Sequence, residues 1–173
     1  GLSRDQVKDA GLEREVASAY DRLGDILGGS RASNLGDAAG GLNCYRKSLA
    51  ILERISAQQP GNFTVLRDTA RAHTKVSDLL AITGKLQEAL DEDKKALAIY
   101  DAWVTATPSD PAARRGLATG LQELAGDLDR AGRFEEALAN RRKVLSIFEE
   151  LDASAAKPDP SLKLQLALAY KRL

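Results

Sequence analysis

The chain has 173 residues, of which 43% are hydrophobic and 29% charged, ordinary values for a folded protein. Its 25 basic and 25 acidic side chains cancel, which argues against a nucleic-acid binder because such proteins usually carry a basic excess. The single cysteine excludes an internal disulfide, and neither a signal peptide nor a membrane span is indicated. Because the chain lacks methionine and opens on glycine, we interpret it as a piece of a longer protein.

The first predicted unit covers residues 12–58 and contains two segments with helical spacing. VASAYDRL at 16–23 and GDAAGGLNCYRKSLAIL at 36–52 carry apolar residues three, four or seven positions apart. This spacing places them on one face of an α-helix. The connecting segment GGSRASNLG at 28–36 is five residues longer than its counterpart in the next unit, and we interpret it as a slack surface loop.

The next two units, predicted at 62–106 and 110–153, contain nearly the same helix. GKLQEALDEDKKALAIY at 84–100 and GRFEEALANRRKVLSIF at 132–148 are identical at seven of 17 positions, 48 residues apart. A fourth unit is represented only by its first helix, predicted at 160–173. A fixed period of this length is typical of a stacked helical array.

Specific positions recur in each first helix of these units, where a small residue is followed three positions later by a larger one. The pairs are Ala17/Tyr20, Ala70/His73, Ala118/Leu121 and Ala167/Tyr170. Pro60 and Pro108 follow the second helices, which proline cannot continue. Gly84 and Gly132 follow the first helices, where a left-handed cap favours glycine. The sequence therefore predicts an all-α fold of about seven helices, stacked as antiparallel pairs.

These residues resemble the tetratricopeptide repeat (TPR) family in their small-residue-then-tyrosine pattern, their Ala89-Leu90 and Ala137-Leu138 pairs and their closing prolines. A TPR unit has about 34 residues, whereas this one has 48. The surplus divides into two segments of about seven residues, nearly two turns each, so both helices lengthen while their buried faces stay in register. The resemblance implies a right-handed α-solenoid forming one domain over 1–173, with a partner-binding concave groove lined by the first helices.

A narrower resemblance concerns the strings AYDRLGDILG, ASNLGDAAG and CYRKSLAI. They are similar to the TPR-bearing C-terminal regions of bacterial serine/threonine protein kinases, acidobacterial ones in particular. This similarity implies a non-catalytic regulatory or recruiting arm of a signalling protein, with the kinase domain upstream of this chain. It also implies a cytoplasmic location, or a periplasmic one if a membrane span precedes the segment.

No group of residues predicts catalysis, metal binding or a cofactor. His73 occupies the inward position that is tyrosine in two other units, while Cys44 and Trp103 lie at helix positions typical of a core. Residues 91–95, DEDKK, point in different directions around a helix and are expected to form a solvated charged face. Residues 28–30, Gly-Gly-Ser, lack the Gly-Lys-Ser/Thr ending of a phosphate-binding loop. We therefore expect no enzyme activity and no cofactor.

A basic stripe is the candidate binding site. Arg14, Arg67 and Arg115 stand six residues before the recurring large residue of their helices, and Arg71 and Lys75 continue from Arg67 along one helix face. Arginine suits carboxylates and phosphates because its planar fork donates two parallel hydrogen bonds. The stripe predicts a protein or peptide partner, acidic or phosphorylated, bound in the groove.

Three alternatives remain open at this level. The stripe is equally explained as a solvated face whose cations pair with acidic residues of the same helices: Asp21, Asp25, Asp78 and Glu123. The chain is alternatively a self-association module that uses the apolar residues Leu164, Leu166 and Leu168 of its last helix. An unrecognised enzyme would require a cleft with perturbed ionisable groups.

Overall fold

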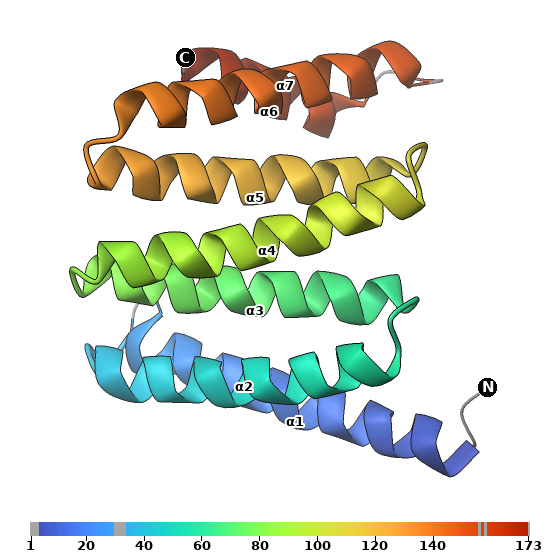
Figure 1. Cartoon of the computed structure of the whole chain (residues 1–173), viewed down its shortest axis with the longest axis vertical. Coiled ribbons are helices and arrows are strands. Elements are labelled where there is room, and N and C mark those ends of the chain that lie inside the picture. Colours follow the sequence, from blue (N-terminus) through green and yellow to red (C-terminus); the bar gives the residue numbers. More distant parts are fainter. Residues whose placement is uncertain (1–3, 30–33, 156, 158, 173) are drawn as a thin grey trace. The chain divides into compact units, whose positions relative to one another are not determined.

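The computed structural model describes residues 4–29, 34–155, 157 and 159–172, and within these residues all regular structure is α-helical, as predicted (Figure 1). The seven helices of this part of the chain are α1 (Arg4–Gly28), α2 (Ala38–Gln58), α3 (Phe63–Ile82), α4 (Leu86–Ala106), α5 (Pro111–Arg130), α6 (Phe134–Ser154) and α7 (Pro160–Lys171). Successive helices run in opposite directions. The first helix begins well before residue 12, and its counterpart at the C-terminal end has only 12 residues.

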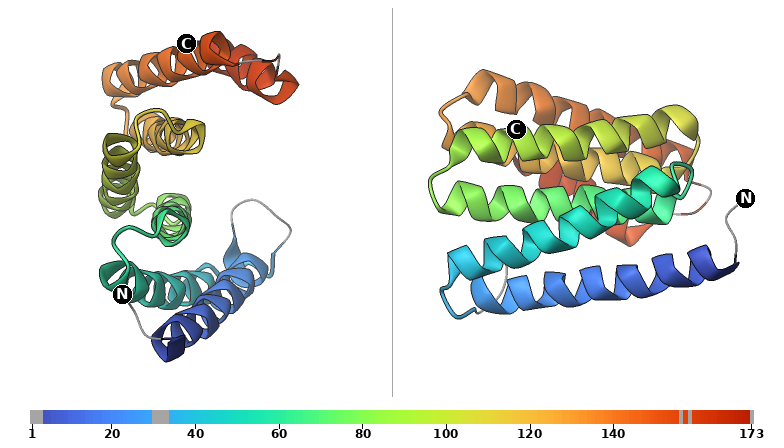
Figure 2. Two further views of the ribbon diagram at one scale, coloured as in Figure 1. Left: turned by 90° about the vertical axis from the view of Figure 1, so that its right-hand side faces the viewer. Right: turned by 60° about the horizontal axis from the view of Figure 1, so that its bottom comes forward.

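The chain divides into two compact units, Gly1–Glu92 and Asp93–Leu173, with the division inside α4. In the N-terminal unit α1 packs on α2 and α2 on α3, and the start of α4 joins the same core. In the C-terminal unit α5 packs on α6 and α6 on α7 (Figure 2). Neighbours in the chain are thus neighbours in space, which is expected where connections are short.

The helix starts are set by polar caps. Side chains accept hydrogen bonds from backbone N–H groups of the first turn at four starts: Asp37 from Gly40, Asn62 from Val65, Asp110 from Ala112, and Asp159 from Ser161 and Leu162. Each satisfies N–H groups that lack a partner within the helix. Pro111 and Pro160 occupy first helical positions, where a missing N–H costs nothing.

The predicted glycines and prolines mark the helix ends. Gly84 and Gly132 have φ angles of +82° and +74°, the left-handed conformation expected of a glycine after a helix. Pro60 and Pro108 each lie two residues beyond the last residue of α2 or α4. These turn predictions are confirmed. Of the predicted loop at 28–36, residues 30–33 lie outside the described residues.

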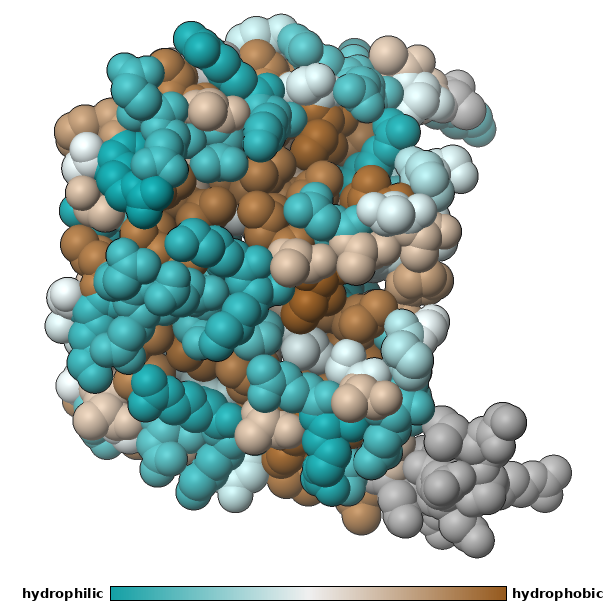
Figure 3. Space-filling model, in the orientation of Figure 1, coloured by the Kyte–Doolittle hydropathy of each residue, from teal (hydrophilic) through white to brown (hydrophobic). Residues whose placement is uncertain are grey.

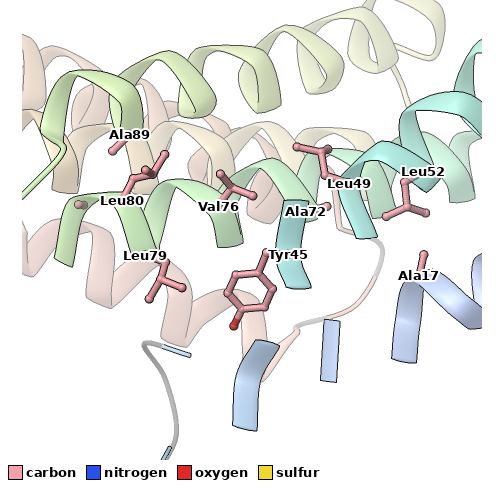
Figure 4. Close-up of a cluster of buried hydrophobic side chains, with 10 residues drawn as sticks. Ala17, Tyr45, Leu49, Leu52, Ala72, Val76, Leu79, Leu80 and Ala89 are labelled. Carbon is pink, nitrogen blue, oxygen red and sulfur yellow. The ribbon is translucent and has the colours of Figure 1, made fainter. Parts of the chain in front are cut away.

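The core of the N-terminal unit is a band of small and aliphatic side chains from α1 to α4 (Figure 4). Its buried members are Ala17, Tyr45, Leu49, Leu52, Ala72, Val76, Leu79, Leu80, Ala81 and Ala89. The alanines let neighbouring helices approach closely where they cross. In the close-up, the Tyr45 ring lies beside the aliphatic groups while its hydroxyl points toward α1.

In each unit an aromatic ring packs on a helix glycine. A Cβ placed on Gly24 of α1 would lie 2.5 Å from the Tyr45 ring of α2, and one on Gly116 of α5 would lie 2.6 Å from the Tyr100 ring of α4. Real side chains do not approach so closely, so each glycine leaves room for the tyrosine.

The C-terminal unit has its own core cluster, contributed mainly by α5, α6 and α7. Its buried members are Ala118, Leu121, Val144, Phe148, Leu151, Leu162 and Ala169. Cys44 and Trp103, expected in the core from their positions, are buried in their respective units. The exposed side chains of the first half of α4 form a hydrophilic surface (Figure 3). The prediction of a fully solvated face at 91–95 is wrong for Asp93, which is only 2% exposed because it points inward.

Candidate functional site

A cavity of about 280 Å³ lies between α1, α2 and α3 of the N-terminal unit. It is lined by Arg14, Ala17, Ser18, Asp21, Arg22 and Asp25 of α1, Ser48 and Leu52 of α2, and Asp68, Arg71 and Lys75 of α3. Four of these side chains are cationic and three are carboxylates. The cavity is therefore strongly polar and mixed in charge, whereas most small-molecule pockets are mainly apolar.

Helical periodicity brings these residues together. Arg14, Ser18, Asp21 and Asp25 follow one another at intervals of four, three and four residues, so they share one side of α1. Asp68, Arg71 and Lys75 do the same along α3, at intervals of three and four. The two polar faces meet beside α2, whose Ser48 contributes a hydroxyl.

On one side of the cavity, Lys75 of α3 contacts side chains of both α1 and α2. Its Nζ lies 2.8 Å from Oδ2 of Asp21 and 2.9 Å from Oδ1 of Asp25, so it bridges two carboxylates of α1. The same Nζ lies 5.2 Å from the centre of the Tyr45 ring, within cation–π range. The Tyr45 hydroxyl donates to Asp25 Oδ1 at 2.6 Å. One lysine thus connects α3 to α1 and to an α2 side chain.

This network shifts the pKa values of Asp25 and Tyr45. Burial by itself would raise the pKa of Asp25, but hydrogen bonds from Tyr45 and Lys75, together with the charge of Lys75, outweigh burial and lower it. Burial and the hydrogen bond to the Asp25 carboxylate both raise the pKa of Tyr45. At neutral pH the pair is therefore an ionised carboxylate accepting from a neutral phenol, a structural rather than a catalytic arrangement.

Asp68 accepts from two arginines on the opposite side of the cavity. Arg14 Nη2 donates to its Oδ2 at 2.6 Å across the α1–α3 contact, and Arg67 Nη2 lies 3.2 Å from its Oδ1 on the same helix. The Arg14 and Asp68 side chains are partly exposed, so the net contribution of this pair to stability is small.

Three polar atoms of the cavity residues are buried without a hydrogen-bond partner among the described residues. They are Nε of Arg14, Oδ1 of Asp21 and Oγ of Ser48, and Ser48 as a whole is only 1% exposed. Buried polar atoms are normally paired, because an unmade hydrogen bond costs about 1–3 kcal/mol. One of the three is a donor, one is an acceptor, and the hydroxyl can be either.

Two further arginines line the cavity with their charges free. Arg22 and Arg71 are exposed, and neither forms an ion pair or a hydrogen bond with another residue in the part of the chain that the structure describes. Arg71 adds to the field that lowers the pKa of Asp25, but it leaves its own fork open. Such a fork can bind a carboxylate by donating two parallel hydrogen bonds to it.

The five residues of the predicted basic stripe have different surroundings. Arg14, Arg71 and Lys75 line the cavity, and Arg67 lies beside it through Asp68. Arg115 belongs to the C-terminal unit, where its Nη2 lies 2.7 Å from Asp159 Oδ2. Lys75 does pair with Asp21 and Asp25, but these are residues of a different helix, not of its own.

Sequence reasoning did not identify Ser48 or Asp68 as site residues. Ser48 stands between core positions of a helix, and Asp68 meets Arg14 from 54 residues away. The only signal was indirect: Ser48 lies at a core-facing position where neighbouring residues are apolar.

The C-terminal unit has a smaller cavity of about 210 Å³ between α5, α6 and α7, lined by Gln122, Glu123, Gly126, Arg141, Val144, Ala169 and Arg172. Its Arg141 is already engaged by Asp129. No lining side-chain atom of this cavity is both buried and without a partner among the described residues. It therefore presents fewer unpaired hydrogen-bonding groups to a ligand than the cavity of the N-terminal unit.

His73 is buried between two carboxylates and does not face either cavity. Its Nδ1 lies 2.7 Å from Glu92 Oε2 and its Nε2 lies 3.5 Å from Glu53 Oε1. Within the described residues, no three His, Cys, Asp or Glu side chains come together as metal ligands would. None of the described helices is both long and apolar enough to cross a membrane.

No known family model matches the chain, and no curated protein matches its sequence. The TPR resemblance therefore depends on the repeated residues themselves.

Proposed function

We propose that this chain is a non-catalytic protein-interaction scaffold that binds a peptide segment in the α1–α3 cavity. The observation that supports this proposal is the set of three buried polar atoms, on Arg14, Asp21 and Ser48, that no described residue satisfies. A ligand that pairs with them would recover hydrogen bonds that the folded chain leaves unmade. Two free arginines at the same cavity supply a second point of recognition.

The cavity chemistry favours a particular kind of peptide. An amide group carries both a donor and an acceptor, so it can satisfy Asp21 Oδ1 and Arg14 Nε together. An acidic side chain next to that amide would reach Arg71 or Arg22. A phosphate carries more negative charge than a carboxylate, so Asp21, Asp25 and Asp68 would repel it more strongly; we therefore favour an acidic peptide over a phosphorylated one.

The wider setting of this function is also a proposal. The period of 48 and the recurring residues support a TPR-like, right-handed stack of long helical hairpins. The similarity to kinase C-terminal regions supports a recruiting arm of a bacterial signalling protein. In that setting the chain would select a partner and bring it to a catalytic domain elsewhere in the same protein.

The proposal is tested by affinity capture from a lysate of the source organism, followed by calorimetry with peptides of the captured partner. Arg71→Glu breaks no ion pair or hydrogen bond among the described residues, although it also reverses one of the charges that lower the pKa of Asp25. The matched control is Arg142→Glu, on an exposed residue of α6 in the other unit. Circular dichroism and thermal melting establish that both variants fold.

We expect a partner that the native chain and Arg142→Glu retain and Arg71→Glu loses. In calorimetry, the partner peptide should bind Arg71→Glu about tenfold or more weakly, because a charge-assisted pair becomes a repulsion. Equal capture by all three proteins would reject the cavity as the binding site. Loss of binding only when the partner is dephosphorylated would instead make the ligand a phosphopeptide.

A further inference from the structure

The outer side of α1 carries a continuous line of exposed apolar side chains. Leu12, Val16, Leu23 and Ile26 are 62%, 42%, 43% and 55% exposed, and the small Ala19 completes the line. We call these five residues the α1 stripe. Their spacing of four, three, four and three is the heptad pattern of a helix that packs along another helix.

The same positions are buried where the chain supplies a neighbouring helix. Fifty-three residues later, the interval between Tyr20 and His73, the equivalents on α3 are Val65, Thr69, Ala72, Val76 and Leu79, and all five are buried. These α3 residues face α2, as the contact of the Thr69 hydroxyl with the Leu52 carbonyl shows. Within the N-terminal unit α2 packs on one side of α1, and the α1 stripe lies on another side (Figure 2). The α1 stripe is therefore a helix-packing face that no described helix of this unit covers.

The stripe is complementary to itself. When two copies of α1 lie antiparallel and centred on Ala19, Leu12 comes opposite Ile26 of the second copy, and Val16 comes within one residue of the level of Leu23. The central alanine allows the two helices to approach to about 8–10 Å, the usual interaxial distance. Each pairing occurs twice by symmetry, as in an isologous dimer.

Charges beside the stripe fit the same arrangement. Glu15 and Arg22 flank the stripe on one side, both are exposed, and neither pairs with a residue that the structure describes. They occupy equivalent flanking positions, seven residues apart. In the antiparallel pair Glu15 lies on the same edge as Arg22 of the second copy and within one residue of its level, so the two long side chains can form two ion pairs on that edge. In a parallel pair Glu15 and Arg22 of the two copies would lie on opposite edges of the contact, so these ion pairs would not form.

We propose that the α1 stripe is a self-association surface, occupied by α1 of a second copy of this chain in antiparallel orientation. None of its five residues lines the cavity of the peptide site proposed above; the two surfaces share only the flanking Arg22. It also differs from self-association through α7, because Leu166 there packs into the core and leaves only Leu164 and Leu168 of the three leucines exposed.

Sedimentation equilibrium over about 1–500 µM protein tests this proposal, since a contact smaller than a standard interface should dissociate in that range. We expect a monomer–dimer equilibrium for the native chain. Val16→Glu/Leu23→Glu should make it monomeric, while the matched control Phe134→Glu, at an exposed position on α6, should not.

The charges give the decisive comparison, because exposed substitutions leave the fold intact. Glu15→Arg should raise the dimer dissociation constant at least about fivefold, since two attractive pairs become two repulsions. Glu15→Arg/Arg22→Glu should restore the native value to within about twofold. A native chain that stays monomeric throughout, or a dimer indifferent to these variants, overturns the proposal. A monomer that instead binds a synthetic peptide of residues 38–58 would assign the stripe to a helix of the α2 type, which also overturns it.

Discussion

At the scale of single residues, the α1–α3 cavity combines satisfied and unsatisfied chemistry. Lys75 and Asp25 have their charges fully engaged, with Tyr45 completing the network. Ser48 and one oxygen of Asp21 are buried without a partner among the described residues. The first group fixes the geometry of the helices, and the second leaves hydrogen-bonding capacity for a ligand.

The Asp25 network should make stability depend on pH. Because the pKa of Asp25 is lowered in the folded state, its contribution is present above its unfolded pKa of about 3.9 and is lost as the pH falls through the folded pKa. We expect Asp25→Asn to destabilise the chain by about 0.5–1 kcal/mol at pH 7, a modest value because the carboxylate is partly exposed. Urea unfolding at pH 7, 5, 4 and 3 should show the difference between variant and native chain shrinking below about pH 4.

Asp101→Asn, on an exposed residue of α4, is the control for this series. It should show no comparable pH-dependent difference from the native chain. A gap for Asp25→Asn that stayed constant down to pH 3 would mean that the carboxylate charge does not stabilise the fold.

At the scale of helices, two glycines in one helix should respond in opposite ways to the same substitution. A Cβ on Gly116 of α5 would overlap the buried Tyr100 ring, whereas one on Gly126 of the same helix meets no atom within 4 Å. Gly116→Ala should therefore cost about 1–3 kcal/mol through overpacking. Gly126→Ala should stabilise by about 0.5–1 kcal/mol, because alanine is the better helix former. Chemical denaturation of both variants measures this, and equal signs would contradict the packing described.

The cap of α7 is the second prediction at this scale. Asp159 accepts from the backbone of Ser161 and Leu162 and from Arg115, and hydrogen bonds from Ser161 and Arg115 hold its pKa below the usual range. Asp159→Ala should speed hydrogen exchange of the α7 amides, since the first turn loses its acceptor. Ser161→Ala removes only the hydroxyl and should have a smaller effect. Unchanged exchange in Asp159→Ala would show that packing alone fixes α7.

The helices themselves were largely readable from the sequence, and the cavity was not. Apolar spacing and the positions of Gly84, Gly132, Pro60 and Pro108 depend on local chemistry that each segment carries by itself. The Arg14–Asp68 contact depends instead on how α1 and α3 meet beside α2, which spacing within one helix does not encode. For the same reason the sequence indicated the residues of the basic stripe but not the side chains that pair with them.

At the scale of the whole molecule, charge balance governs behaviour in solution. The 25 basic and 25 acidic side chains give no net charge near neutrality, with an isoelectric point of about 6.8. Proteins without net charge lack the mutual repulsion that keeps copies apart. Solubility in low salt should therefore pass through a minimum near pH 6.8 and rise on either side. A turbidity series from pH 5 to 9 checks this, and a flat profile would mean that local charge patches dominate.

The contact between Tyr45 and Gly24, and its counterpart between Tyr100 and Gly116, also constrains how the sequence can diverge. A larger residue at either glycine is acceptable only after the facing tyrosine has been replaced by something smaller, and that replacement alone leaves a void. Both single steps are therefore unfavourable, while the double change is tolerated. Each pair should be inherited as a unit, so related sequences should contain either both partners or neither.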